Sequence, residues 1–284
     1  MSFKTFIEKR YPDFVLNQRQ IEQAQAVKVL GILNLTPDSF SDADISLLGP
    51  QKALAKAQSL INSAVDIIDV GAESTRPGAS SVSSDAEWQR LQGFLELYDL
   101  ALPLSLDSRN PQVIAQALEL NPKLTYINDV SGLQNPEVLR SLTDFCGNAG
   151  LKYIAMHSCG GVPPPKSSEI PDDFYKEHGG LEEHMKRFFA KTISSMESYG
   201  LNISNLILDP GLGFGKNLKQ SLEIIEIIPR LKQEFGLEIL LGPSRKSFLK
   251  LWKNNHQASL QDLDLYSLRY CLEVVDQVNY FRLH

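Results

Sequence analysis

The stretch VDIIDVGAESTRPG (65–78) joins two kinds of sequence that rarely adjoin. Its first part, VDIIDVGA (65–72), is an almost continuous apolar run, which is typical of a parallel strand buried on both faces. Its second part, ESTRPG (73–78), combines an acid, two hydroxyls and an arginine with proline and glycine, without helix or strand periodicity. The stretch therefore predicts a buried strand that ends in a polar loop.

The same arrangement recurs along the chain. The other apolar runs are VKVLGILNL (27–35), LPLSLDS (102–108), LTYINDVS (124–131), LKYIAMHS (151–158), LILDPGLG (206–213), EILLGPS (238–244) and QVNYFRLH (277–284). Eight β–α units over about 250 residues predict a single-domain α/β fold, the (β/α)8 TIM barrel. The barrel would span residues 27–284, with residues 1–26 as an N-terminal extension. A doubly wound open sheet has the same alternation, but no G-x-G-x-x-G follows the first run.

Segments with apolar residues at three- and four-residue spacing lie between the runs and predict helices. They are QKALAKAQSLINSA (51–64), NPQVIAQALEL (110–120), NPEVLRSLTDFC (135–146), LEEHMKRFFAKTISSMESYG (181–200) and LKQSLEIIEIIPRLKQEFG (218–236). Two of them open with Asn-Pro, a cap residue followed by proline at the first helical position. The segment 160–180 is too long for a tight turn and is interpreted as an active-site loop.

Composition narrows the classes of function. The chain of 284 residues has 28 Lys and Arg against 34 Asp and Glu, a net charge of −6, which argues against general binding to nucleic acid or to an anionic membrane. Its three cysteines form no C-x-x-C pair, as expected in a reducing compartment. Neither a signal-peptide core nor an apolar run of membrane-spanning length is visible. These features indicate a cytoplasmic, soluble protein.

Polar residues gather at the carboxyl ends of the predicted strands, and in a barrel these ends form one functional face. A single Asp there is usually a turn or cap residue, and His157 alone is better interpreted as a hydrogen-bonded core residue. The loop DPGLGFGK (209–216) lacks the ending of an ATP-binding P-loop. The complete set is more informative than its members, because every strand offers a polar group at the same end.

Two chemistries are present at that face. Asp107, Asn128 and Asp209 offer acceptors and an amide that suit a flat heterocycle rich in N–H groups. A rim of basic and hydroxyl groups suits an anion such as phosphate. The members of this rim are Arg76, Ser244, Arg245, Lys246, Arg282 and His284. Together the two sets indicate a heterocycle that carries an anionic leaving group.

These stretches resemble the dihydropteroate synthase family of pterin-binding barrels. The most distinctive matches are NLTPDSFSD (34–42), ESTRPG (73–78) and DPGLGFGK (209–216), and weaker matches occur at every other strand end, in order. The resemblance implies the joining of 6-hydroxymethyl-7,8-dihydropterin pyrophosphate to p-aminobenzoate, which gives 7,8-dihydropteroate and pyrophosphate in folate biosynthesis. It also implies a homodimer.

The resemblance further implies roles for individual residues. Asp107, Asn128, Asp209 and Lys246 would bind the pterin, with Met156 lining its pocket. Arg282 and His284 would contact pyrophosphate, with Arg76 nearby. The p-aminobenzoate site would comprise Thr75, Pro77, Phe214 and Ser244, and Gly242 would belong to the substrate site. Asn34 would bind Mg²⁺, and the catalytic group would comprise Asp107, Asp209, Lys246 and Arg282.

The chain departs from the family pattern in three loops and at its last strand. The first loop reads SDADISLLGP (41–50) in place of a Gly-Gly continuation, the fifth loop is longer, and Pro243 stands where threonine is common. The family continues beyond the last strand with a helix that covers it. We expect that cover here to come from a following segment, from residues 1–26 or from a partner subunit, because parallel strands are covered on both faces.

Two other functions fit part of the pattern. A methyltetrahydrofolate-dependent methyltransferase would share the Asp and Asn floor but would need no anion-binding rim. An inactive paralogue would be expected to lack Asn34, Asp107, Asp209, Lys246 or Arg282, and all five are present. For Glu73, a structural bond to a neighbouring loop is a better interpretation than a catalytic role.

Overall fold

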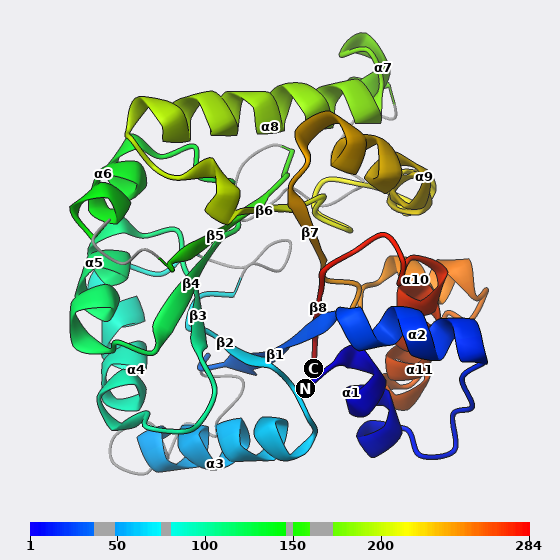
Figure 1. Cartoon of the computed structure of the whole chain (residues 1–284), viewed down its shortest axis with the longest axis horizontal. Coiled ribbons are helices and arrows are strands. Elements are labelled where there is room, and N and C mark those ends of the chain that lie inside the picture. Colours follow the sequence, from blue (N-terminus) through cyan, green and yellow to red (C-terminus); the bar gives the residue numbers. More distant parts are fainter. Residues whose placement is uncertain (37–48, 75–80, 146–149, 160–172) are drawn as a thin grey trace.

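The structure, a computed structural model, describes residues 1–36, 49–74, 81–145, 150–159 and 173–284. The strands in these residues form one closed parallel barrel, each pairing with the next in the chain (Figure 1). They are β1 (Lys28–Asn34), β2 (Ile67–Gly71), β3 (Leu104–Asp107), β4 (Leu124–Asp129), β5 (Lys152–Met156), β6 (Leu206–Asp209), β7 (Glu238–Leu241) and β8 (Tyr280–Leu283). Pairing of β8 with β1 closes the barrel, so the predicted TIM barrel is confirmed and the open sheet is wrong.

Helices surround the barrel (Figure 1). They are α1 (Phe3–Arg10), α2 (Gln18–Ala26), α3 (Gly49–Asn62), α4 (Ser84–Leu97), α5 (Pro111–Leu120), α6 (Pro136–Asp144), α7 (Phe174–Glu177), α8 (Leu181–Ser198), α9 (Leu218–Phe235), α10 (Phe248–Trp252) and α11 (Leu260–Glu273). The two Asn-Pro starts are confirmed, since Asn110 and Asn135 cap α5 and α6 through their side chains. Among the described helices, none combines the length and the apolar character needed to cross a bilayer.

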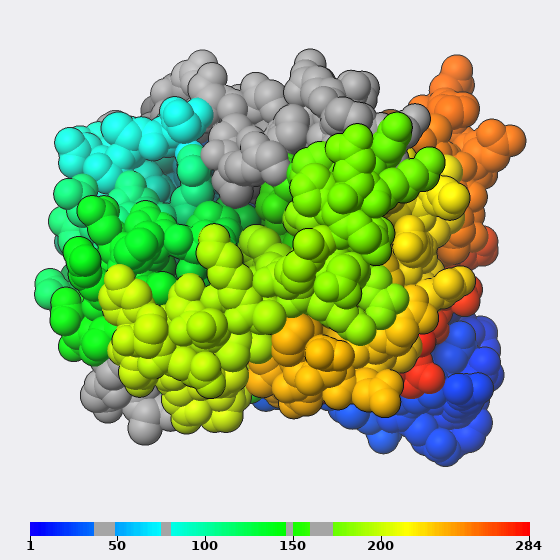
Figure 2. Space-filling model, turned by 90° about the horizontal axis from the view of Figure 1, so that it is seen from above, coloured from blue at the N-terminus to red at the C-terminus, as the bar shows by residue number. Residues whose placement is uncertain are grey.

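The N-terminal helix α1 lies against the outside of β8. Phe3 and Phe6 are buried, and the ring of Phe3 lies 4.6 Å from the ring of Phe281, between centroids. The Phe3 amide also donates to the carbonyl of Val27, just before β1. Figure 2 shows the same association of the N-terminal (blue) and C-terminal (red) segments at one end of the molecule. Of the three covers expected for β8, residues 1–26 supply one.

The barrel interior has an apolar layer of side chains, and a polar group lies between this layer and the amino ends of the strands. Strand side chains alternate between the two faces of a sheet, so every second residue of each strand points into the barrel. The apolar layer contains Leu30, Ile67, Tyr126, Ile154, Ile207, Leu240 and Tyr280. Toward the amino ends, Lys152 pairs with Glu238, and the Tyr280 hydroxyl donates to Glu238 at 3.0 Å. The interior is therefore filled, and the other end of the barrel is left for a site.

Candidate active site

The site begins one layer above the apolar layer. Because the period of a strand is two, the next inward positions lie two residues further along each strand. They are Ile32, Asp69, Asp107, Asn128, Met156, Asp209, Gly242 and Arg282. Six of these eight were predicted as site residues from the sequence. One step higher on the same inward register lie Asn34, at the end of β1, and His284, after β8.

Arg282 joins three strands at this level. Its Nε donates to the Asp69 carboxylate at 2.5 Å, and one Nη donates to the Asp107 carboxylate at 2.5 Å. Asp69 is fully buried and also accepts from the Asn128 amide at 3.4 Å. One guanidinium thus pairs with two acids inside the barrel, which offsets part of the cost of burying their charges.

Sequence reasoning assigned no role to Asp69. The residue lies at the centre of the polar layer, since both Arg282 and Asn128 bind it. The alternation of the strand could have identified it, because Asp69 follows the inward Ile67 by two positions. Without the register of the barrel, Asp69 was indistinguishable from an ordinary acid near the end of a strand.

Burial sets the protonation of the acids. It raises the pKa of Asp107 to about 7, an effect opposed by Arg282 and reinforced by the Asp69 charge. The pKa of Asp209 is also raised by burial, while the Gly211 amide and the Lys246 charge oppose the rise. Asp107 therefore titrates near neutral pH in the ligand-free protein.

The sixth loop is organised around Asp209. The Asp209 carboxylate accepts from the Gly211 amide at 2.8 Å, and Gly211 has a positive φ of 69°. A Cβ on Gly211 would lie 2.0 Å from the carbonyl oxygen of His157, so only glycine fits this turn. The loop consequently fixes the orientation of an acid at the mouth of the barrel.

Lys216 holds the same loop from inside. Its Nζ donates to the carbonyls of Gly211, Phe214 and His157 at 2.9, 3.0 and 3.1 Å. Burial lowers the pKa of Lys216 to about 7, and the three acceptors favour the protonated form with its three donors. This role could not be predicted, because nothing in the motif DPGLGFGK indicates that its lysine turns back onto the loop.

Lys246 and Phe214 meet at the mouth. The Lys246 Nζ lies 4.0 Å from the centroid of the Phe214 ring, within the range of a cation–π interaction. The Ser244 hydroxyl lies 2.8 Å from Nδ1 of His284. Residues from loops six and seven and from the end of β8 are thereby brought together, as predicted from their positions after strands.

The structure contradicts the predicted role of Arg245. It was predicted to belong to the cationic rim, but its guanidinium binds both carboxylate oxygens of Asp264 on α11, at 2.7 and 2.9 Å. Arg245 faces α11 because the two oxygens of a carboxylate match the paired N–H groups of a guanidinium, and this bidentate pair is stronger than hydrogen bonds to water. The cationic rim therefore loses Arg245 as a member.

Glu73 and His157 are structural, as predicted. Both oxygens of Glu73 accept from Arg109, after β3, at 3.0 and 3.1 Å, and the Val82 amide also donates to Glu73. His157 is fully buried, with its Nε2 2.8 Å from Nδ1 of His184. The predictions for Thr75, Arg76 and Pro77 concern positions outside the described residues.

Three comparisons identify relatives of this chain. A family model described as a pterin binding enzyme matches residues 30–284. Dihydropteroate synthase of Escherichia coli strain K12 is 36% identical over 225 residues, which cover 78% of this chain and 74% of that protein. The enzyme of Neisseria meningitidis serogroup C is 35% identical over 223 residues, with 78% and 75% covered.

The chain belongs to the dihydropteroate synthase family. Solved structures of dihydropteroate synthases agree with this assignment. The Clostridium difficile protein, solved with pteroic acid, is 31% identical with a TM-score of 0.78, covering 92% of this chain and 91% of that one. The Xanthomonas albilineans protein, solved with 4-aminobenzoic acid, is 30% identical with a TM-score of 0.76, covering 91% and 87%. The family resemblance stated from the motifs is confirmed.

Proposed function

We propose that this chain joins 6-hydroxymethyl-7,8-dihydropterin pyrophosphate to p-aminobenzoate, with release of pyrophosphate. The observation that carries the proposal is the inward layer of Asp107, Asn128, Met156, Asp209 and Arg282 at the carboxyl ends of the strands, in a chain of this family. The carboxylates and the Asn128 amide match the donors and acceptors along the edge of a pterin ring. Met156 is buried beside them and offers an apolar surface.

The chemistry needs charge stabilisation rather than a nucleophile. When pyrophosphate leaves, the methylene on the pterin becomes electron-poor, and the fixed carboxylates of Asp107 and Asp209 stabilise that positive charge. The amine of p-aminobenzoate then attacks the methylene. Pyrophosphate competes with Asp69 and Asp107 for the guanidinium of Arg282, because all three are anionic. In this arrangement Lys246 would bind the pterin and Phe214 would line the p-aminobenzoate site, as the family resemblance implies, and the contact between them supports a position where the two substrates meet.

Magnesium fits the proposal through Asn34. Mg²⁺ is usually held by one or two protein oxygens together with substrate phosphates and water. Asn34 supplies one oxygen donor at the inward end of β1, half-buried at the mouth. Among the described residues there is no cluster of three or more His, Cys, Asp or Glu that could form a complete protein cage. The metal would neutralise charge on the departing pyrophosphate.

One assay tests this function. Purified protein is incubated with Mg²⁺, the pterin pyrophosphate and p-aminobenzoate, and both pyrophosphate and dihydropteroate are quantified. We expect the two products in equal amounts, and no dihydropteroate when p-aminobenzoate is omitted. Folded protein that forms no product above the enzyme-free blank would contradict the proposal. That result would favour an inactive paralogue, even though this sequence retains the five residues that such a paralogue would be expected to lack.

We also propose a cytoplasmic homodimer, on the strength of the family resemblance and the sparse cysteines. Sedimentation equilibrium tests the assembly, with an expected mass of twice the 31.7 kDa of one chain. A single species of 31.7 kDa at micromolar concentration would contradict it. Fractionation of the source cells, followed by immunodetection, tests the compartment.

A further inference from the structure

The backbone of the seventh loop has an unusual conformation at Arg245. Its φ is 56°, in the left-handed region that side chains with a Cβ rarely occupy. A residue in this region persists only where its surroundings hold it there. Arg245 stands between Ser244 and Lys246, which the family resemblance assigns to the substrate site.

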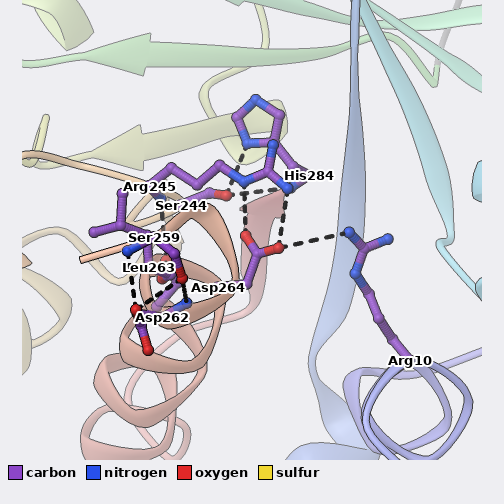
Figure 3. Close-up of polar contacts among 9 residues, drawn as sticks. Arg10, Ser244, Arg245, Ser259, Asp262, Leu263, Asp264 and His284 are labelled. Carbon is purple, nitrogen blue, oxygen red and sulfur yellow. Dashed lines mark hydrogen bonds and ion pairs between the residues drawn. The ribbon is translucent and has the colours of Figure 1, made fainter. Parts of the chain in front are cut away.

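Helix α11 holds Arg245 at two points. The guanidinium binds Asp264 through two hydrogen bonds, and the Arg245 amide donates to the hydroxyl of Ser267 at 3.0 Å. Asp264 and Ser267 are three residues apart, so they share one face of the helix. Figure 3 shows Arg245 directed toward α11, with Asp264 between it and Arg10.

The side chains of the two neighbours of Arg245 make other contacts. Ser244 contacts His284 beside the end of β8, and Lys246 lies over the ring of Phe214. A left-handed residue reverses the direction of the chain locally, so Lys246 can face the mouth and Ser244 can contact His284 while Arg245 faces α11. Releasing Arg245 to an ordinary φ would redirect at least one of them.

The N-terminal helix completes this arrangement. An Arg10 Nη lies 3.9 Å from the same Asp264 carboxylate, giving that acid a second cation. A small cavity between α1 and the loop is lined by Phe6, Tyr11, Ser244, Asp264 and His284, among others. The acid thus lies between the N-terminal extension and the substrate site.

We infer that Asp264 is a positioning residue, which directs Ser244 and Lys246 into the site by holding Arg245 in its left-handed conformation. This inference rests on the proposed function for the identity of the substrates. Asp264 touches neither of the two site residues in this role and acts on them through Arg245.

Paired substitutions at Arg245 test the mechanism. Arg245→Ala and Arg245→Gly both remove the guanidinium, but only glycine adopts a left-handed conformation without strain. We expect Arg245→Ala to lower kcat/KM by on the order of tenfold to a hundredfold, as small misplacements of reacting groups do. Arg245→Gly should recover most of that loss. Equal losses in the two variants would overturn the inference, since they would mean that the guanidinium itself acts on substrate.

Paired substitutions on α11 test the acid. Asp264→Asn removes the ion pair, whereas Asp262→Asn makes the same chemical change two residues away, in the capping box with Ser259. We expect kcat/KM to fall in Asp264→Asn and to stay unchanged in Asp262→Asn, with both variants folded by circular dichroism. In the Arg245→Gly background, Asp264→Asn should have little further effect. Similar kinetics in the two single variants would contradict the positioning role.

A readout without turnover separates this inference from the proposed function. Lysines are reductively methylated with ¹³C, and the Lys246 signal is assigned by its loss in Lys246→Arg. The Phe214 ring should shift that signal upfield, and the shift should disappear in Asp264→Asn and remain in Asp262→Asn. An inactive native protein with this pattern would refute the function and support the positioning. An active native protein in which the Lys246 shift remains after Asp264→Asn would support the function and refute the positioning role.

Discussion

At the scale of the residue, charge is concentrated in one layer of the barrel. Asp69, Asp107 and Asp209 are nearly inaccessible to solvent, and Arg282 binds the first two directly. Such a layer is costly to build, because each ion loses its hydration. The cost is accepted where fixed charges must be ready before substrate arrives, which is the condition for electrostatic catalysis.

Lys246→Ala should abolish turnover and leave the fold intact. The ammonium group lies at the mouth over Phe214, and loss of a charged group at a reacting centre typically lowers kcat by on the order of a hundredfold or more. Lys250→Ala, four residues further along the chain in α10, is the matched control and should keep its activity. Steady-state kinetics with circular dichroism measures both. Near-normal turnover in Lys246→Ala would remove this residue from the site.

Protonation of Asp107 should make kcat/KM fall on the acidic side of the pH profile, which is called the acidic limb below. Its pKa is raised to about 7, chiefly by burial, so its ionised fraction falls as the pH drops below that value. Since the carboxylate accepts from a pterin N–H group more strongly than the protonated acid does, kcat/KM for the pterin substrate should decline from pH 8 to pH 6. Asp107→Asn should lower the plateau and flatten this limb, whereas the exposed Asp85→Asn should keep it. A limb unchanged in Asp107→Asn would assign the titration to another group.

Sequence alone placed these residues at one end of the barrel but could not show how they bind one another. The positions of Asp107, Asn128 and Asp209 follow from strand ends and alternation, which are local properties. The bonds of Arg282 to Asp69 and Asp107 join positions 213 and 175 residues apart. Arg245 was misassigned for the same reason, since its partner Asp264 lies on a helix that no motif linked to the loop.

At the scale of the element, α1 is part of the fold rather than an appendage. Phe3, Phe6 and Ile7 are in the same hydrophobic core as the outward residues of the barrel, including Phe281. Its N-cap is Ser2, whose hydroxyl accepts from the Thr5 amide. The helix therefore has both a start signal and an apolar face directed at β8.

Phe3→Ala should lower the free energy of unfolding by about 3–5 kcal/mol, the usual cost of truncating a buried phenylalanine. The residue is fully buried and packs on Phe281 at 4.6 Å between ring centroids. Val15→Ala, in the same N-terminal segment but 89% exposed, should change it by less than about 0.5 kcal/mol. Urea titrations followed by circular dichroism give both values. Equal midpoints for the two variants would show that α1 does not contribute to the stability of the barrel.

Strands were predicted more completely than helices, because their apolar runs are a strong signal in the sequence. All eight apolar runs became strands, because burial on both faces leaves a strong pattern. Helices α4 and α11 were not predicted from the sequence. Gly93 interrupts the apolar pattern of α4, and polar residues interrupt the apolar face of α11. The place of α1 could not be predicted, because it depends on β8 at the far end of the chain.

At the scale of the whole molecule, one continuous core joins the barrel, its helices and the N-terminal segment. Trp88 on α4 and Trp252 on α10 lie in different sectors of the ring of helices (Figure 1). A single core predicts that both sectors unfold together.

We therefore expect Trp88→Phe and Trp252→Phe, each with one tryptophan left, to show the same urea midpoint by fluorescence and by circular dichroism. The closed ladder from β1 to β8 leaves no boundary at which one sector could open first. Midpoints that differ between the two variants, with equal circular dichroism midpoints, would reveal sectors of independent stability.

The docking of α1 on β8 also constrains the order of events during synthesis. Phe3 and Phe281 are 278 residues apart in the chain, yet the two rings pack together. Helix α1 is therefore made long before β8, and its apolar face stays uncovered until β8 has closed the barrel. Contacts so distant along the chain form slowly, and uncovered apolar surface invites association with other chains. Newly made protein thus passes through a vulnerable interval that lasts until β8 has been made and has paired with β1.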